Sequence, residues 1–211
     1  MKLNKGTKAV IYALLILVAV YFLFPFVYMF FSAFKTEAEI NAIPPSLFPK
    51  KFLWSNFVNA WQSQEFGTFL KNSILVTIGT TVGQLLSCSL VAYGFARYEF
   101  KGKNVLFMIL LSTMMIPWDV TMIPQYMEFK LFGWINTLKP LIVPSWFGSA
   151  YYIFLMRQFL MGVPKDYEEA ARIDGANAFQ IYSRIFMPIL RPQLILVAVL
   201  NLLTVWNDYL G

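Results

Sequence analysis

The chain has 211 residues, of which 58% are hydrophobic and only 13% are charged. A soluble globular domain usually has about 45–50% apolar and about 25% charged residues, so an aqueous core cannot hold this much apolar surface. The net charge of +6 comes from basic residues scattered between apolar runs, which argues against nucleic-acid binding. With no histidine and one cysteine, Cys88, the sequence excludes an intrachain disulfide and a histidine-based triad, and argues against a zinc site. We expect an integral membrane protein without metal or cofactor.

Five segments are apolar and long enough to be predicted as membrane-spanning helices, since a helix needs about 20 such residues to cross the bilayer. Helices satisfy their own backbone hydrogen bonds in lipid, and these runs are too long and alternate too poorly for barrel strands. The first is too long for the apolar part of a signal peptide, so we expect it to be retained. The predicted helices cover about 9–34, 72–96, 104–124, 138–160 and 188–207.

Basic residues are distributed unequally between the two sides of this predicted all-α bundle. With a cytoplasmic N-terminus, the inner segments hold eleven of the 17 lysines and arginines and the outer segments hold six. Positive residues are enriched on the cytoplasmic side, so we expect Lys103 and Gly175 inside and Trp54 outside. The aromatic-rich outer connection 35–71 either lies at headgroup level or docks an external partner, and the sequence leaves both possibilities open.

Small and polar residues within the apolar runs mark candidate helix contacts. Gly79 and Gly83 stand four residues apart, a spacing that lets helices approach closely. We expect them to pack within the bundle, with a dimer seam as the alternative. Gln84 and Asn201 either line the translocation path or form hydrogen bonds between helices.

The long connection 163–188 is predicted to form two short helices on the cytoplasmic side. Asp166 suits an N-cap, and Glu169 three residues later would complete a capping box. Glu168 and Arg172 stand four residues apart and are expected to pair. These local rules alone assign the segment no function.

The turn and the end of this connection follow from three other residues. Gly175 suits the left-handed position after the first helix. The second helix is predicted to begin near Asn177, and Pro188 is expected to break or kink it at the membrane.

The same connection resembles the EAA loop of ABC importer permeases, whose pattern is E-A-A-x3-G-x9-I-x-L-P. The match is spread over 20 positions, and its only departure is Met187 in place of leucine. The resemblance implies that the loop docks on an ATPase subunit and couples it to transport. The matching residues are Glu169, Ala170, Ala171, Gly175, Ile185 and Pro188.

Other stretches resemble the maltose-type (MalG-like) carbohydrate permeases, and together they cover nearly the whole chain: 92–103, 115–117, 123–126, 154–159 and 173–175. This resemblance implies a type I ABC importer transmembrane domain (MetI-like) over 1–211, in the bacterial plasma (inner) membrane. It implies ATP-driven uptake of a sugar or oligosaccharide through a path of which this chain forms half. The implied partners are two copies of an ABC ATPase subunit, a homologous second permease subunit and an external solute-binding protein.

The family usually has a sixth span, and the sequence stops where that span would follow, so we expect a C-terminally truncated domain with five spans. The chain lacks the G-x-x-x-x-G-K-[ST] phosphate loop and is therefore not expected to be an enzyme. The resemblance does not identify the sugar, and a permease for another solute is the main alternative. A secondary transporter would need ionisable groups within its membrane spans, and the middles of the predicted spans contain almost none. A membrane-embedded enzyme would need a catalytic cluster of side chains. The only carboxylate cluster in the sequence lies in the connection 163–188 and consists of Asp166, Glu168, Glu169 and Asp174.

Overall fold

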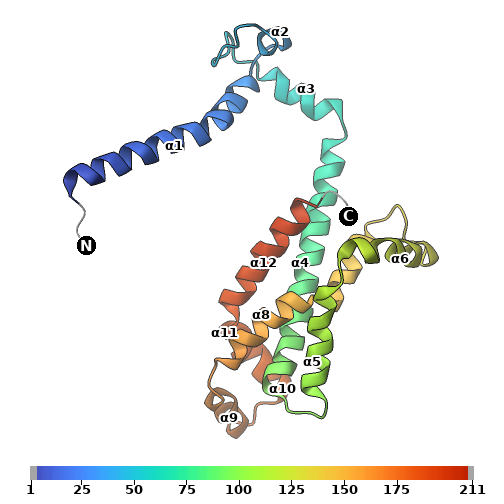
Figure 1. Ribbon diagram of the computed structural model, residues 1–211. Helices are drawn as coiled ribbons and strands as arrows, with labels where there is room; N and C mark the ends of the chain where they lie inside the picture. Colours follow the sequence, from blue (N-terminus) through green and yellow to red (C-terminus); the bar gives the residue numbers. More distant parts are fainter. Residues whose placement is uncertain (1–3, 209–211) are drawn as a thin grey trace. The chain divides into compact units, whose positions relative to one another are not determined.

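The computed structural model describes residues 4–208, and within that range it is helical and contains no strand (Figure 1). The chain divides into two compact units, Met1–Phe69 and Leu70–Gly211. The expected all-α class is therefore confirmed.

The first unit begins with a long apolar helix. Helix α1, Lys5–Ser32, spans 28 residues and buries none of them. It is followed by α2, Glu37–Ile40, and α3, Ser55–Ser63. A helix that is apolar on all sides needs an apolar surrounding, which lipid or another subunit supplies.

The connection between α1 and α3 is held by several specific contacts. The Lys35 side chain is buried, donates to the carbonyl of Ser46 and lies 4.7 Å from the ring centre of Tyr28. The Asn56 amide donates to the carbonyls of Ala33 and Lys35 at 3.0 and 2.9 Å. Aromatic rings cluster around them, namely Phe31, Phe34, Phe48, Phe52, Trp54 and Phe57. The outer connection is thus a folded element with exposed aromatic edges.

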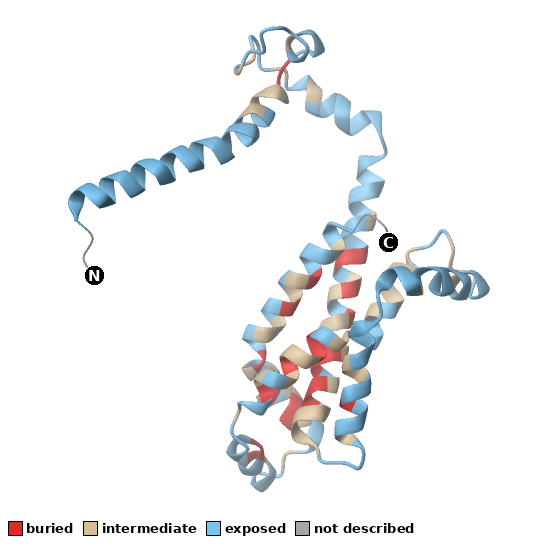
Figure 2. Ribbon diagram, in the orientation of Figure 1, coloured by how far each residue is buried: buried red, intermediate tan, exposed pale blue. Residues whose placement is uncertain are grey.

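The second unit is built around α4, Phe66–Arg97, whose 32 residues begin at the end of the first unit. Helix α8, Ala150–Met161, contacts α5, Lys103–Ser112, and α12, Arg191–Trp206, which lie on either side of it (Figure 1). The buried residues of these helices form one core, shown in red in Figure 2. Its fully buried members are Cys88, Ala92, Met156, Leu160, Phe186, Leu190 and Val197.

The segment expected as one helix over 104–124 is instead bent. Helix α5, Lys103–Ser112, continues into a 3₁₀ turn, Thr113–Met115, and then meets α6, Trp118–Leu131, at 98°. The break lies at Ile116, whose extended backbone is the conformation favoured before Pro117. Pro117 also lacks the N–H that would continue the helix.

The segment expected as a helix over 138–160 is also interrupted. It consists of α7, Lys139–Ile142, a 3₁₀ turn, Val143–Phe147, and α8. Gly148 between the turn and α8 has φ +86°, which no regular helix allows. The interruption places Trp146 against α4, where a Cβ on Gly83 would come within 2.5 Å of the indole.

Gly79 faces Ile142 in the same way, with 3.0 Å between its hypothetical Cβ and that side chain. The expected packing of this glycine pair within the bundle is therefore confirmed. Among the described residues, α1 and α4 alone are long and apolar enough to span a membrane, and the number rises to four if each bent helix pair is one span. The interrupted segment 138–160 is the expected fifth span that does not meet this test.

Substituting Gly83 with Ala is expected to lower the thermal stability of the detergent-purified chain. The added methyl group would force the Trp146 ring to move, and overpacking of this kind typically costs about 1–3 kcal/mol. Gly94→Ala in the same helix is the matched control, because nothing lies within 4 Å of its Cβ position. Melting followed by circular dichroism measures both variants, and equal melting temperatures would contradict the close contact.

Candidate functional site

The connection 163–188 contains the first helix of the predicted pair, α9, Asp166–Ile173. The predicted capping box is wrong, because Lys165 is the N-cap residue and no side chain caps the helix. The Lys165 carbonyl accepts the N–H groups of Glu168 and Glu169 at 2.9 and 3.1 Å. Asp166 therefore lies inside the first turn. Its negative charge interacts favourably with the helix dipole there, but its side chain does not cap the helix. The carboxylate of Glu169 is left available for another purpose.

Two adjacent glutamates of α9 have different surroundings. Glu168 is 7% exposed and pairs with Arg172 at 2.6 Å, as the four-residue spacing predicts. This hydrogen bond and the charge of Glu168 raise the pKa of Arg172 above its ordinary value. Glu169 is exposed, and its side chain makes no hydrogen bond or ion pair with any residue in 4–208. Of these two glutamates, Glu169 is therefore the one whose carboxylate is available to a partner.

The turn after α9 has the left-handed conformation predicted at Gly175, with φ +79°. The Gly175 N–H donates to the Arg172 carbonyl at 3.1 Å, and the Ala176 N–H donates to the Ala171 carbonyl at 2.9 Å. These two bonds form a Schellman motif, which fixes the direction of the chain. Ala171 is buried beneath the turn, whereas Ala170 is exposed.

The second helix, α10, Ala178–Ile181, begins after Asn177 as predicted. Asn177 and Gln180 form a capping box, with side-chain bonds of 2.9 and 2.8 Å to each other's backbone N–H. The chain then forms a wide π turn, Tyr182–Phe186, before α11, Met187–Ile189. Pro188 lies in α11 and cannot donate a backbone hydrogen bond, which accounts for the widened turn before it.

The predicted break of this segment lies two residues beyond Pro188. The helical stretch Ala178–Ile189 meets α12, Arg191–Trp206, at 72°. Pro192 at the start of α12 removes a further backbone donor at the bend. Ile185 is partly buried against the core, so it anchors the end of the loop.

Arg97, the last residue of α4, joins both ends of this loop. Its guanidinium donates to the carbonyls of Leu160 and Val163 at 2.9 and 2.8 Å. It also lies 4.5 Å from the ring centre of Phe186, within the range of a cation–π contact. Sequence analysis missed this role, although Arg97 is the charge that ends the apolar run 72–96.

A buried polar contact joins α4 to the π turn nearby. The hydroxyl groups of Ser89 and Tyr182 are 2.8 Å apart. The Tyr93 ring centre lies 5.4 Å from that of Tyr182 and 5.1 Å from that of Phe186. The loop is therefore attached to α4 through both side-chain hydrogen bonds and ring packing, so a force on the loop would reach α4 directly.

The outer surface of the loop is apolar as well as acidic. Ile173 is 86% exposed and Phe179 is 72% exposed, and Tyr167 is exposed too. Exposed apolar side chains next to a free carboxylate are typical of a protein–protein contact.

Comparison with known proteins identifies the family. Residues 86–211, which include the whole loop, match the family described as "binding-protein-dependent transport system inner membrane component". The chain belongs to this family. It is therefore a multi-pass permease component of an inner-membrane transport system and not an ATPase.

Relatives of this permease match along most of its length. The diacetylchitobiose uptake permease protein NgcG of Streptomyces coelicolor is 32% identical over 98% of this chain and 68% of its own. The arabinooligosaccharide transport permease protein AraQ of Halalkalibacterium halodurans is 31% identical over 89% of this chain and 68% of its own. The sn-glycerol-3-phosphate transport permease protein UgpE of Yersinia enterocolitica is 30% identical over 98% of this chain and 75% of its own.

A solved structure supports the fold. The permease superposes on a chain of a bacterial ABC transporter that imports the acidic polysaccharide alginate, with a TM-score of 0.86 at 23% identity. The match covers 99% of this chain and 75% of the other. The permease therefore has the fold of an ABC importer transmembrane component.

Of the two polar residues suggested for the path of the permease, Asn201 bonds to another helix and Gln84 bonds within its own. The Asn201 amide donates to the hydroxyl oxygens of Thr80 and Thr81 at 3.3 and 2.9 Å, which joins α12 to α4. Gln84 accepts from the Cys88 thiol at 3.1 Å within α4. The structure does not bring these two residues to the loop.

Proposed function

We propose that this permease carries a sugar or oligosaccharide across the bacterial inner membrane, as half of the path of an ATP-driven importer. The functions of its relatives support this substrate class, since NgcG, AraQ and the starch-product permease AmyC are all permeases for saccharides. UgpE, which serves a phosphorylated polyol, supports the alternative of a non-sugar solute.

The loop 163–188 is the element that couples this permease to ATP hydrolysis in a partner. The exposed and unpaired Glu169, held on a short helix beside a rigid Schellman turn, carries this proposal. Its carboxylate meets a basic residue in a cleft of an ABC ATPase subunit, and Ile173 and Phe179 pack around it. The assembly has two ATPase copies, a homologous second permease subunit and an external solute-binding protein.

Transport assays of the assembled importer in proteoliposomes test the function. Uptake of diacetylchitobiose, arabinotriose or maltotriose should require internal ATP and the binding protein, and should continue when ionophores collapse the ion gradients. Uptake that follows an ion gradient without ATP would identify a secondary transporter instead.

The proposed topology has a cytoplasmic N-terminus and five crossings, the interrupted segment 138–160 included. It predicts that a cysteine at Lys51 reacts with an impermeant maleimide in right-side-out vesicles, whereas one at Ile173 does not. Both positions are exposed, so accessibility within the protein does not limit either reaction. Both cysteine variants also carry Cys88→Ser, so that the native thiol cannot react with the maleimide. Labelling of Ile173→Cys together with protection of Lys51→Cys would show that the topology is the reverse of the proposed one.

A further inference from the structure

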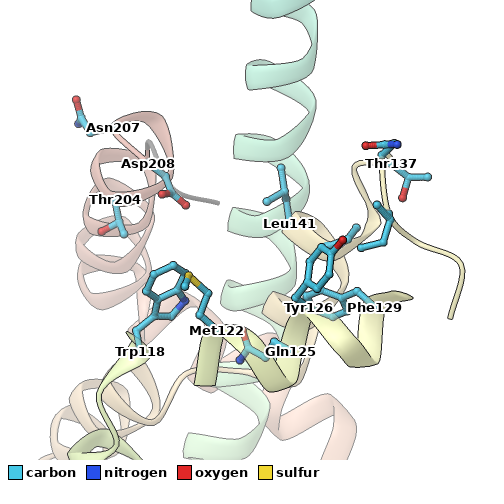
Figure 3. A pocket seen from close by; sticks show the side chains of 13 residues that line it. Trp118, Met122, Gln125, Tyr126, Phe129, Thr137, Leu141, Thr204, Asn207 and Asp208 are labelled. Atoms are coloured by element: carbon cyan, nitrogen blue, oxygen red, sulfur yellow. The ribbon is translucent and has the colours of Figure 1, made fainter. Parts of the chain in front are cut away.

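Aromatic side chains of this permease have two different kinds of surroundings. Those of α6, such as Trp118 and Tyr126, face a cavity of about 1100 Å³ that α7 and the end of α12 also line (Figure 3). Those along α3 extend from the helix surface, where Trp54 and Trp61 are both exposed. The aromatic side of α3 is therefore available to an occupant from outside the described chain.

The apolar residues of α3 form one continuous stripe. Trp54, Phe57, Val58 and Trp61 have the i, i+3, i+4, i+7 spacing that places side chains on one side of a helix. All four are exposed. Asn59, which is also exposed, lies on the other side of the helix because successive residues are about 100° apart. The helix is thus amphipathic, and most of its apolar side is uncovered.

Two kinds of contact attach this stripe to the end of α1. The buried Phe34 ring has its centre 4.9 Å from that of Trp54 and 5.2 Å from that of Phe57. The Asn56 amide holds the start of α3 against two backbone carbonyls just beyond α1. Helix α3 is therefore fixed at the level where α1 ends.

The bilayer determines that level. Helix α1 is apolar on all sides, and its 28 residues measure about 42 Å at about 1.5 Å per residue. The hydrocarbon core is about 30 Å thick, and the headgroup regions extend the bilayer to about 40–45 Å. Both ends of α1 therefore reach the headgroup regions when it crosses the membrane. The stripe of α3, which is attached to one of these ends, lies at the same depth.

The composition of α3 favours a lipid interface over a soluble protein as the occupant. Indole rings are enriched at headgroup depth because they combine an apolar body with an N–H donor. Residues 52–64 contain no charged side chain. Surfaces that bind and release a soluble protein are more polar than permanent interfaces, and they use charges to select the partner. The exposed apolar stripe also continues the lipid-facing surface of α1 without a break.

We propose that α3 is an interfacial helix in the headgroup region, with its stripe directed toward the acyl chains and Asn59 directed toward water. In the proposed topology this is the outer face of the membrane. The helix fixes the depth of the adjoining end of α1. The proposal goes beyond transport of the solute, because it depends only on α1 crossing the membrane. It selects the headgroup interpretation of the connection 35–71.

Spin labels on adjacent residues of α3 test the proposal. Val58→Cys and Asn59→Cys, each combined with Cys88→Ser, are labelled and reconstituted in nanodiscs of phosphatidylethanolamine and phosphatidylglycerol. Relaxation by oxygen, which concentrates in lipid, and by a water-soluble nickel chelate measures the surroundings of each label. The label at position 58 should collide mainly with oxygen, and the label at position 59 mainly with the nickel chelate. Equal access of the nickel chelate to both positions would overturn the proposal.

The same labels in the assembled importer distinguish lipid from a protein occupant. Oxygen should still reach position 58 there. Exclusion of both oxygen and the nickel chelate from position 58 would show that another protein covers the stripe, and would also overturn the proposal.

Removal of one indole provides a second test. With the label at position 58, Trp61→Asn should raise the ratio of nickel to oxygen collisions several-fold, because the stripe loses one of its two indole anchors. Gln62→Asn is the matched control, since it shortens a neighbouring exposed side chain without removing apolar surface. An unchanged ratio in Trp61→Asn, or an equal change in Gln62→Asn, would contradict the anchoring role. The first measurement depends on neither variant.

Discussion

Glu169→Gln is expected to abolish most ATP-driven uptake by the assembled importer while the chain inserts and folds normally. Glutamine keeps the shape of the side chain, and the carboxylate forms no hydrogen bond or ion pair within residues 4–208 that could be lost. If it meets a basic residue of the ATPase, its removal leaves that charge unpaired. A loss of about 3 kcal/mol would weaken docking roughly a hundredfold.

Asp166→Asn is the matched control for this experiment. It removes one negative charge from the first turn of the same helix, and Asp166 is also exposed. Uptake per folded transporter and co-purification of the ATPase are measured for both variants. Wild-type uptake by Glu169→Gln, or an equal loss in Asp166→Asn, would show that the coupling does not depend on this carboxylate.

Arg97→Met is expected both to destabilise the chain and to reduce coupling. Methionine retains part of the apolar stem, but the bonds to the carbonyls of Leu160 and Val163 and the contact with Phe186 are lost. Hydrogen bonds to charged groups contribute about 1.5–3 kcal/mol each, so a loss of at least about 2 kcal/mol is expected. Because the start of the loop then loses its bonds to α4 and the end keeps only those made by Ser89 and Tyr93, uptake should fall more than the folded fraction does.

Arg157→Met separates this effect from the general loss of an arginine. Arg157 also lies over a ring, 4.1 Å from the centre of Phe107, and donates to the Phe95 carbonyl at 3.4 Å. It does not hold the loop. Melting temperature and uptake are compared at matched expression, and equal uptake defects in the two variants would argue against a specific role for Arg97.

The sequence predicted the fold class and the local structure of the loop because both depend on short-range rules. Apolar content requires a membrane, Gly175 permits the left-handed turn, and Asn177 caps the second helix. The position of the first cap could not be predicted in this way, because Lys165 and Asp166 both follow Pro164 and either can begin the helix.

Other features were missed because they depend on contacts between distant segments. The helices over 104–124 and 138–160 were predicted from counts of apolar residues. Such counts do not reveal the extended backbone at Ile116 or the positive φ at Gly148, which interrupt them. The role of Arg97 needs Leu160 and Val163, more than sixty positions away, to lie beside it.

The π turn Tyr182–Phe186 takes up one extra residue within the helical stretch that ends the loop. An α-helix advances about 100° per residue, and a π turn accommodates one residue more than an α turn. Because the extra residue is taken up within the turn, deleting a single residue there would restore ordinary helical pairing and leave Asn201 facing Thr80. The π turn therefore fits the nine positions between Gly175 and Ile185 between the left-handed turn at Gly175 and the helical stretch that packs on α4.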